Sequence, residues 1–152
     1  MFVAIDKFTK WPEVEPVRSI TAAAAVRFIR GVFTRFGVAN RIITDNGTQF
    51  TSAAFVEFCE EMGSKICYAS PVHPQSNGQV ERANAAVLNG LKTRAFDRLQ
   101  GQARQWIEEL SAVLWSIRTT PSRATGETPF FLVYGAEAVL PTELAFRSPR
   151  AS

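Results

Sequence analysis

The feature that most constrains the fold is a pair of short apolar segments, residues 41–44 (RIIT) and 65–69 (KICYA), separated by a helical pattern at residues 52–62. Strands that flank a helix in this way are expected to pair in parallel, with a right-handed crossover. Ligands of such sheets bind beyond the carboxyl ends of the strands. Asp45 directly follows the first of these strands. Its position is therefore suited to a binding site.

The rest of the chain predicts an α/β domain in which a hairpin precedes this unit and helices follow it. In chain order, the further elements are strands at 2–9 and 12–17, helices at 21–36, 78–99 and 103–118, and a helical turn or packed extended segment at 130–135. Helical spacing assigns these apolar residues to inward faces: Val26, Ile29, Phe33, Phe36, Phe55, Cys59, Met62, Val80, Ala83, Val87, Leu88, Leu91, Trp106, Leu110, Val113, Leu114 and Ile117.

Composition excludes several classes of protein. The 152 residues carry a net charge of +3 with an isoelectric point near 9.2, which suits a nucleic-acid partner without requiring one. One histidine and two cysteines cannot assemble a zinc site of the Cys/His type, so we expect Cys59 and Cys67 to be reduced thiols. No apolar run approaches the roughly 18 residues that a membrane span requires. The first residues also lack the features of a signal peptide.

Two acidic residues are candidate metal ligands, although each also has an ordinary structural interpretation. Asp45 begins the sequence Asp-Asn-Gly, which commonly forms a tight turn. Glu81, which is separated from Asp45 by thirty-five residues, lies in the first turn of the predicted long helix. Unsatisfied backbone N–H groups favour an acidic capping residue there. Taken alone, neither residue distinguishes a ligand from a turn or a cap.

The segments TDNGTQFTS (44–52) and HPQSNGQVERAN (73–84), with this interval between their acidic residues, resemble the catalytic core of retroviral and retrotransposon integrases. The segments FVAIDKFTKWPEVEPV (2–17) and RTTPSRATGETPFFLVYG (118–135) narrow the resemblance to gypsy-type elements of the plant lineages. The resemblance to this family extends from residue 1 to about residue 145. The resemblance implies a ribonuclease-H-like fold and a triad of two aspartates and a glutamate that binds two Mg²⁺ or Mn²⁺ ions. Such hard cations prefer carboxylate oxygens.

By this resemblance, Asp45 is the second aspartate of the triad and Glu81 is its glutamate, so both would be catalytic residues and metal ligands. In the family, the loop before the catalytic helix contacts the DNA end. Gln75, Asn77 and Gly78 are assigned to DNA binding on this basis. Asn84 and Lys92 are assigned to DNA binding because helical spacing from Glu81 places them on its solvent face, and an ordinary solvated helix face is the alternative. Arg82 and Arg94 are further candidates for phosphate contacts, and we interpret His73 as a turn residue between two prolines.

The first aspartate of the triad has no match in this chain. Asp6 lies in the hairpin that corresponds to the family's second and third strands, so we interpret it as a hairpin residue. The missing first strand is the central one of the family's five-stranded sheet and would precede Met1. The hairpin is then expected either to pair directly with the strand at 41–44 or to leave a gap in the sheet. With two of three carboxylates, ion binding is expected to be weakened and the chain inactive in strand transfer.

The remaining expectations concern organisation and partners. Residues 1–145 are predicted to form an integrase catalytic-core-like domain that is incomplete at its N-terminus, and residues 146–152 a frayed tail. The resemblance implies a fragment of a retrotransposon polyprotein that binds DNA, both element ends and target, forms a homo-oligomer through the core and acts in the nucleus. No membrane or small-molecule substrate is expected. The alternative is a non-catalytic DNA- or protein-binding module derived from an integrase.

Overall fold

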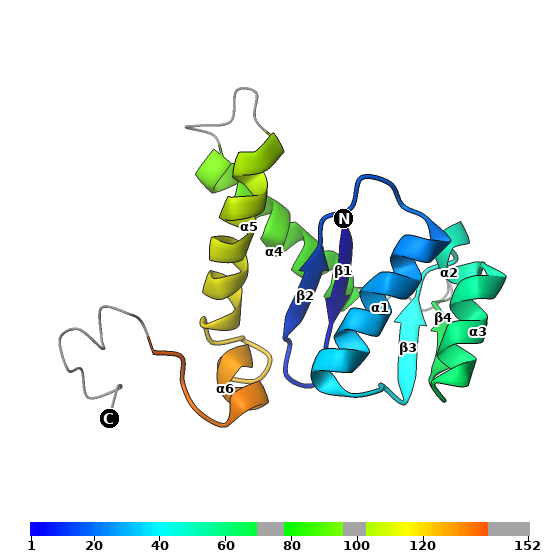
Figure 1. The fold of residues 1–152 in the computed structure, drawn as a ribbon. Helices are drawn as coiled ribbons and strands as arrows, with labels where there is room; N and C mark the ends of the chain where they lie inside the picture. The colour runs from blue at the N-terminus through cyan, green and yellow to red at the C-terminus, as the bar shows by residue number, and fades with distance from the viewer. Residues whose placement is uncertain (70–77, 96–102, 140–152) are drawn as a thin grey trace. The chain divides into compact units, whose positions relative to one another are not determined.

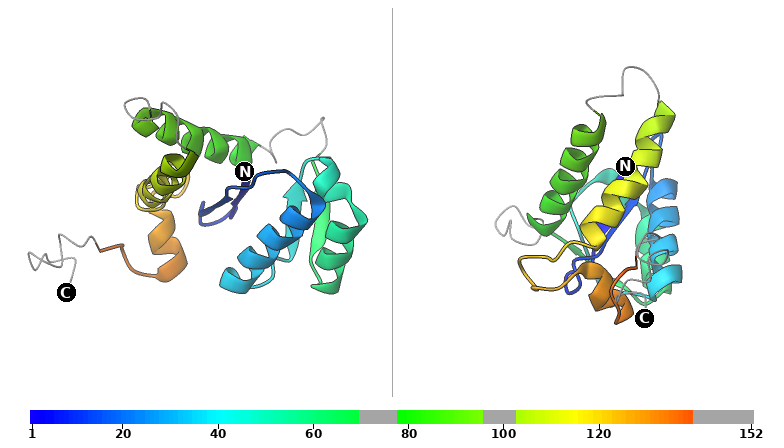
Figure 2. Two further views of the ribbon diagram at one scale, coloured as in Figure 1. Left: turned by 45° about the horizontal axis from the view of Figure 1, so that its top comes forward. Right: turned by 90° about the vertical axis from the view of Figure 1, so that its left-hand side faces the viewer.

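The computed structural model describes residues 1–69, 78–95 and 103–139 of the chain. Two compact units are present: unit 1 comprises residues 1–4 and 13–84, and unit 2 comprises residues 5–12 and 85–152. In chain order the elements are β1 (Phe2–Ile5), β2 (Pro12–Glu15), α1 (Ala22–Phe36), β3 (Arg41–Thr44), α2 (Thr48–Thr51), α3 (Ala53–Glu61), β4 (Lys65–Tyr68), α4 (Gly78–Ala95), α5 (Ala103–Arg118) and α6 (Pro129–Tyr134) (Figures 1 and 2). The predicted order is confirmed, and α2 is an additional short helix.

Helix α1 begins and ends where the sequence predicts, because both of its ends are capped. The Thr21 hydroxyl accepts a hydrogen bond from the Ala24 backbone N–H at 3.1 Å, which satisfies one of the free donors of the first turn. Gly37 has a φ of +88°, and its N–H donates to the Phe33 carbonyl at 2.8 Å. A positive φ favours glycine, so the chain leaves the helix at this residue.

Strands β3 and β4 pair in parallel, as predicted, with Arg41 opposite Lys65 and Thr44 opposite Tyr68. The side chains of Ile42 and Ile66 pack against the core of unit 1. This core is formed by β1, α1 and α3 and contains the buried residues Phe2, Ala24, Ala25, Phe28, Ile29, Phe33, Phe55 and Cys59. Both cysteines are free thiols, as predicted, and burial raises the pKa of the Cys59 thiol.

In the described residues, the hairpin and the parallel pair form two separate two-stranded sheets, β1–β2 and β3–β4. The hairpin strands run in opposite directions (Figure 1). Of the two arrangements that the sequence left open, the structure therefore has the gap, and β3 does not pair with the hairpin.

Thr44 at the end of β3 is 8% exposed, and within the described part of the chain its hydroxyl has no hydrogen-bond partner.

The helix predicted at residues 52–62 is α3, and the additional short helix α2 ends directly before it. Ser52 separates them because its backbone is extended, with φ −64° and ψ 146°, and its hydroxyl accepts the Phe55 N–H at 3.3 Å. A serine at this position begins a new helix rather than continuing the previous one. The long helix α4 is described as far as Ala95, so the predicted end at residue 99 lies outside the described residues.

The predicted inward faces are confirmed at nine positions: Ile29, Phe33, Phe55, Cys59, Ala83, Val87, Leu110, Val113 and Leu114 are buried. The prediction is wrong for Phe36, Met62 and Leu88, which are 40–43% exposed. Phe36 is the last residue of α1, and Met62 follows the last residue of α3, so both lie beyond the packed turns. Leu88 follows the fully buried Val87 and lies about 100° further around the helix, so it is turned away from the buried face. The side chains of Leu91 and Trp106 lie outside the described residues.

In unit 2, aromatic rings connect the hairpin turn to α5 and α6. The ring of Trp11 lies 5.6 Å from that of Tyr134 and 6.2 Å from that of Phe130. The Arg118 guanidinium lies 4.2 Å from the centre of the Trp11 ring and donates two hydrogen bonds to the Pro12 carbonyl, at 2.7 and 3.2 Å. A planar guanidinium can stack and donate in this way at the same time.

None of the helices in the described residues is long and apolar enough to cross a membrane.

Candidate functional site

Asp45 lies at the carboxyl end of β3, and its carboxylate is exposed. Its Oδ1 atom accepts a hydrogen bond from the Gly47 backbone N–H at 2.9 Å. This is the local turn that Asp-Asn-Gly sequences favour, so the structural interpretation of the motif is confirmed. The turn uses one carboxylate oxygen. Within the described residues, no hydrogen bond or ion pair involves the other oxygen, which leaves it available for a ligand.

Gly47 leaves room for the side chains of Asp45 and Gln49 to approach the turn closely. A Cβ atom at this residue would lie 2.9 Å from Asp45 Oδ1 and 2.5 Å from Gln49 Nε2. The backbone φ of −57° is ordinary, so a larger residue here would meet these side chains but would not strain the backbone. Gln49 was not singled out from the sequence, because nothing in its spacing indicates that its side chain folds back over the turn.

Replacing Gly47 with alanine is expected to displace the Asp45 carboxylate while changing the free energy of unfolding by less than about 1 kcal/mol. The clashing atoms are the ends of flexible side chains, which can move away at low cost. Hydrogen exchange of the residue-47 amide, measured by NMR, should accelerate because its acceptor is lost. The exposed neighbour Thr48, changed to alanine, is the control and should leave this amide protected. Unchanged protection in the Gly47 variant would contradict the geometry.

Glu81 lies in the first turn of α4, and its side chain is exposed. Across residues 1–69, 78–95 and 103–139, its carboxylate forms no hydrogen bond or ion pair. Its neighbour Arg82 is engaged locally, since the guanidinium Nε donates to the Gly78 carbonyl at 2.9 Å. Asn84 is half-buried one turn further along the same helix.

Several predicted residues cannot be placed. Gln75, Asn77 and His73 lie outside the described residues, as do the side chains of Lys92 and Arg94. Asp45 and Glu81 belong to the same compact unit, but no hydrogen bond joins them in the part of the chain that is described. The same part contains no group of three or more histidine, cysteine, aspartate or glutamate residues that could hold a metal ion.

Asp6 is a hairpin residue, as predicted. Its Oδ2 atom accepts hydrogen bonds from the backbone N–H of Thr9 at 3.0 Å and from the Thr9 hydroxyl at 2.7 Å. Its backbone N–H donates to the Trp11 carbonyl at 3.0 Å, and its carbonyl accepts from the Lys10 N–H at 2.9 Å. The carboxylate therefore stabilises the connection between β1 and β2.

Comparison with known proteins places the chain among integrases. Residues 1–74 match the family model described as Integrase core domain. Over 98% of its length the chain is 33% identical to the Pol polyprotein of Feline endogenous virus ECE1, and it spans 14% of that polyprotein. The solved HTLV-2 integrase catalytic core domain in complex with magnesium matches with a TM-score of 0.71 and 22% identity, covering 87% of this chain and 82% of that one.

A second solved structure, the simian T-cell lymphotropic virus intasome in complex with PP2A regulatory subunit B56 gamma, contains a chain that matches with a TM-score of 0.76 and 24% identity. The match covers 91% of this chain and 49% of that one. Both structural matches concern the fold, while the family model and the polyprotein match concern the sequence. The chain therefore belongs to the integrase core family of retroviral and retroelement polyproteins and has the ribonuclease-H-like fold of integrase catalytic cores.

Proposed function

We propose that the chain supplies part of a divalent-metal site for polynucleotidyl transfer in DNA integration, with Asp45 and Glu81 as ligands. The observation that carries this proposal is the placement of two exposed carboxylates, one directly after β3 and one in the first turn of α4, within one compact unit. The related HTLV-2 core was solved in complex with magnesium. Magnesium and manganese prefer such oxygen ligands.

The ligand set fits the ions in kind but not in number. The described residues offer no cluster of three or more candidate ligands, whereas a pair of ions needs shared carboxylates. When bound, divalent ions supply activation of the attacking hydroxyl and stabilisation of the leaving oxygen. In this chain, Asp45 and Glu81 would hold an ion weakly, and we propose that the chain by itself does not join DNA ends.

DNA is the proposed partner, both as element ends and as target. Gly78 and Asn84 on α4 are accessible in part and are proposed DNA contacts together with Gln75, Asn77 and Lys92. The net charge of +3 favours binding to phosphates. Related cores were solved in dimeric and trimeric forms, and we propose that this core also self-associates.

The finer assignments are also proposals. We propose that the chain derives from a gypsy-type element of a plant lineage and acts in the nucleus, on the motifs alone. Residues 1–145 are proposed to form the core-like domain, with 146–152 as a tail, and residues 140–152 lie outside the described residues.

Binding of Mn²⁺ tests the proposed ligands. In NMR spectra of the full chain, Mn²⁺ is expected to broaden the amide signals around both Asp45 and Glu81. Asp45→Asn and Glu81→Gln should each weaken this binding by about tenfold or more, because loss of one charged partner costs about 1.5–3 kcal/mol. The matched controls are Asp6→Asn and Glu61→Gln, which change the same residue types elsewhere and should leave the broadening unchanged. In the same preparations, no Mg²⁺-dependent joining of a DNA end to a target duplex is expected.

Each contradicting result has a distinct meaning. Joining by this chain would show that the proposed inactivity is wrong and would indicate Asp6 as a third carboxylate. Broadening that is absent, or equal in the Asp45→Asn variant, would exclude the proposed ligands. The second candidate function, a non-catalytic DNA- or protein-binding module, would then be favoured. The lack of a third ligand in the described residues supports that candidate.

A further inference from the structure

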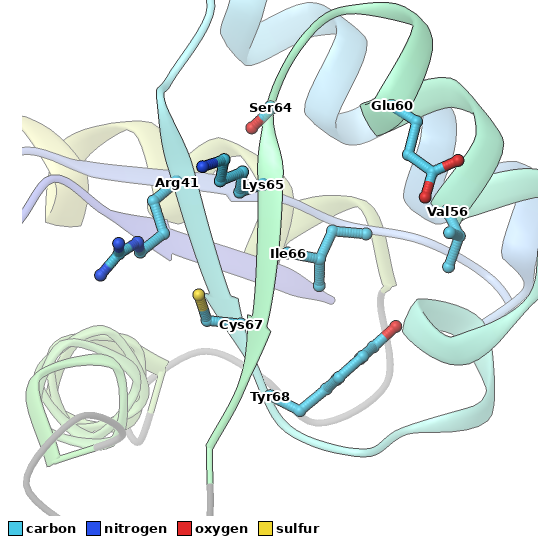
Figure 3. Close-up of a pocket in the computed structure, with 8 residues that line it drawn as sticks. All are labelled: Arg41, Val56, Glu60, Ser64, Lys65, Ile66, Cys67 and Tyr68. Atoms are coloured by element: carbon cyan, nitrogen blue, oxygen red, sulfur yellow. The ribbon is translucent and has the colours of Figure 1, made fainter.

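A groove of about 440 Å³ follows strand β4 in unit 1. Its walls come from the whole of β4 and from β3 and α3, and its lining residues are Arg41, Val56, Glu60, Ser64, Lys65, Ile66, Cys67 and Tyr68. Figure 3 looks onto β4, with the side chains of the groove leaving the strand on two sides. The groove is distinct from Asp45 and Glu81, neither of which lines it.

The backbone of β4 presents unused hydrogen-bonding groups along one edge. The Lys65 N–H donates to the Asn40 carbonyl at 3.0 Å, and the Ala69 N–H donates to the Thr44 carbonyl at 2.7 Å. Bonds in a parallel ladder are evenly spaced and involve alternate residues. The N–H and C=O groups of Ile66 and Tyr68 therefore point away from β3. No strand in the described residues pairs with that edge.

The two sides of the groove differ in chemistry. Arg41, Lys65 and Cys67 point to one side, where Arg41 and Lys65 are opposite each other in the strand register (Figure 3). Both cations are exposed, and neither forms an ion pair within the described residues. Ile66 and Tyr68 point to the other side (Figure 3). This gives β4 a basic face.

The opposite face is apolar and fixed in position. Val56 of α3 and Ile66 of β4 are half-buried there. The Tyr68 hydroxyl donates to the Phe50 carbonyl at 3.0 Å, which holds the phenol ring against α2. Glu60 lies at the rim of this face and disfavours a second negative charge beside it.

We propose that this edge binds an extended peptide as an additional β-strand, with acidic side chains on the face of Arg41 and Lys65 and apolar side chains on the face of Val56 and Ile66. Side chains of a strand alternate between faces, so a peptide of alternating acidic and apolar residues matches both sides at once. A shift of one residue would place its acidic groups beside Glu60, so the charges also specify the register.

Two other occupants fit less well. A second copy of β4 would bring its own Arg41 and Lys65 to an edge that is already basic, and like charges repel. A nucleic-acid phosphate could use the two cations, but it would use neither the apolar face nor the outward backbone groups of Ile66 and Tyr68. The acidic peptide uses all three features.

Fluorescence anisotropy with the full chain and a labelled Val-Glu-Val-Glu-Val-Glu peptide tests this proposal. Saturable binding is expected, and replacing every Glu in the peptide with Lys should weaken it about tenfold or more. N-methylation of single peptide amides should weaken binding at alternate positions only, because an added strand directs alternate N–H groups to its neighbour. The bound peptide should slow hydrogen exchange at Ile66 and Tyr68, whereas the Lys65 amide, already bonded to Asn40, should change little.

A charge-reversal variant tests the same contact from the protein side. Lys65→Glu should weaken binding of the Glu peptide and strengthen binding of the Lys peptide, and Lys65 is exposed, so the fold should be retained. Arg18→Glu, an exposed change of the same sign elsewhere, should alter neither. Absence of binding, loss at every N-methyl position alike, displacement of the peptide by a short DNA duplex, or a dimer abolished by Lys65→Glu would each overturn the proposal.

Discussion

Replacing Phe55 with alanine is expected to lower the free energy of unfolding by about 3–5 kcal/mol. Phe55 is 1% exposed and lies in the core of unit 1 with Cys59, which is fully buried. Its ring centre lies 5.3 Å from that of Phe50, in an edge-on arrangement. Truncation therefore removes a large buried apolar area and an aromatic contact, and it leaves a cavity that the surrounding helices fill only in part.

Urea unfolding followed by far-UV circular dichroism measures this loss. The matched control is Phe8→Ala, because Phe8 is 80% exposed and the same truncation there should change the stability by less than about 0.5 kcal/mol. All three tryptophans, Trp11, Trp106 and Trp115, belong to unit 2, so tryptophan fluorescence reports on that unit separately. Equal losses in the two variants would show that α3 does not anchor the core.

The parallel pair β3–β4 could be predicted from the sequence because its pattern allows few alternatives. Residues 41–44 have an apolar centre, Ile42 and Ile43, and the structure places β3 at residues 41–44. A helix between two such runs requires a crossover, and that requirement fixes the parallel direction. The position of Asp45 at the carboxyl end of β3 follows from the same argument. The placement of Glu81 in the first turn of α4 follows instead from the helical pattern that begins at Gly78.

Burial of these strands could not be predicted, because it depends on what covers the sheet. The sequence predicts a short buried strand at residues 65–69 and an apolar-cored strand at residues 41–44, yet Tyr68 is 41% exposed and Ile43 is 39% exposed. A sheet of two strands has two edges and too little neighbouring structure to cover both faces. The same incompleteness leaves the outward backbone groups of Ile66 and Tyr68 without a strand partner among the described residues.

The positions of Asp45 after β3 and Glu81 in the first turn of α4 could be predicted from the sequence, and their role as ligands stays a prediction. The local geometry could not be predicted, because the fold of Gln49 over the turn and the close approach at Gly47 depend on atomic positions that no spacing encodes. The start of α3 could be predicted from the sequence. A serine three residues before Phe55 is a common helix start, and Ser52 is the N-cap of α3.

Replacing Gly90 with alanine is expected to lower the free energy of unfolding by up to about 2 kcal/mol, although alanine favours helices. A Cβ atom at Gly90 would lie 2.7 Å from Val113 Cγ1 and 3.2 Å from Val113 Cγ2. Both residues belong to unit 2, where α4 and α5 approach closely at this glycine. Val113 is 3% exposed and has little room to move. Overpacking of this kind costs about 1–3 kcal/mol, which exceeds the gain of about 1 kcal/mol in helix propensity.

The same substitution at Gly31 should have the opposite sign, which makes it the matched control. Gly31 also lies inside a helix, but the atoms nearest to a Cβ there belong to the flexible Arg35 guanidinium, the first of them at 3.3 Å. A gain of about 0.5–1 kcal/mol is expected in urea unfolding. In the double variant Gly90→Ala with Val113→Ala, part of the clash should be relieved because the contacting methyl groups are removed. The loss of stability in the double variant should therefore be smaller than the sum of the losses in the two single variants. Stabilisation by Gly90→Ala alone would show that α4 and α5 are not in close contact at this residue.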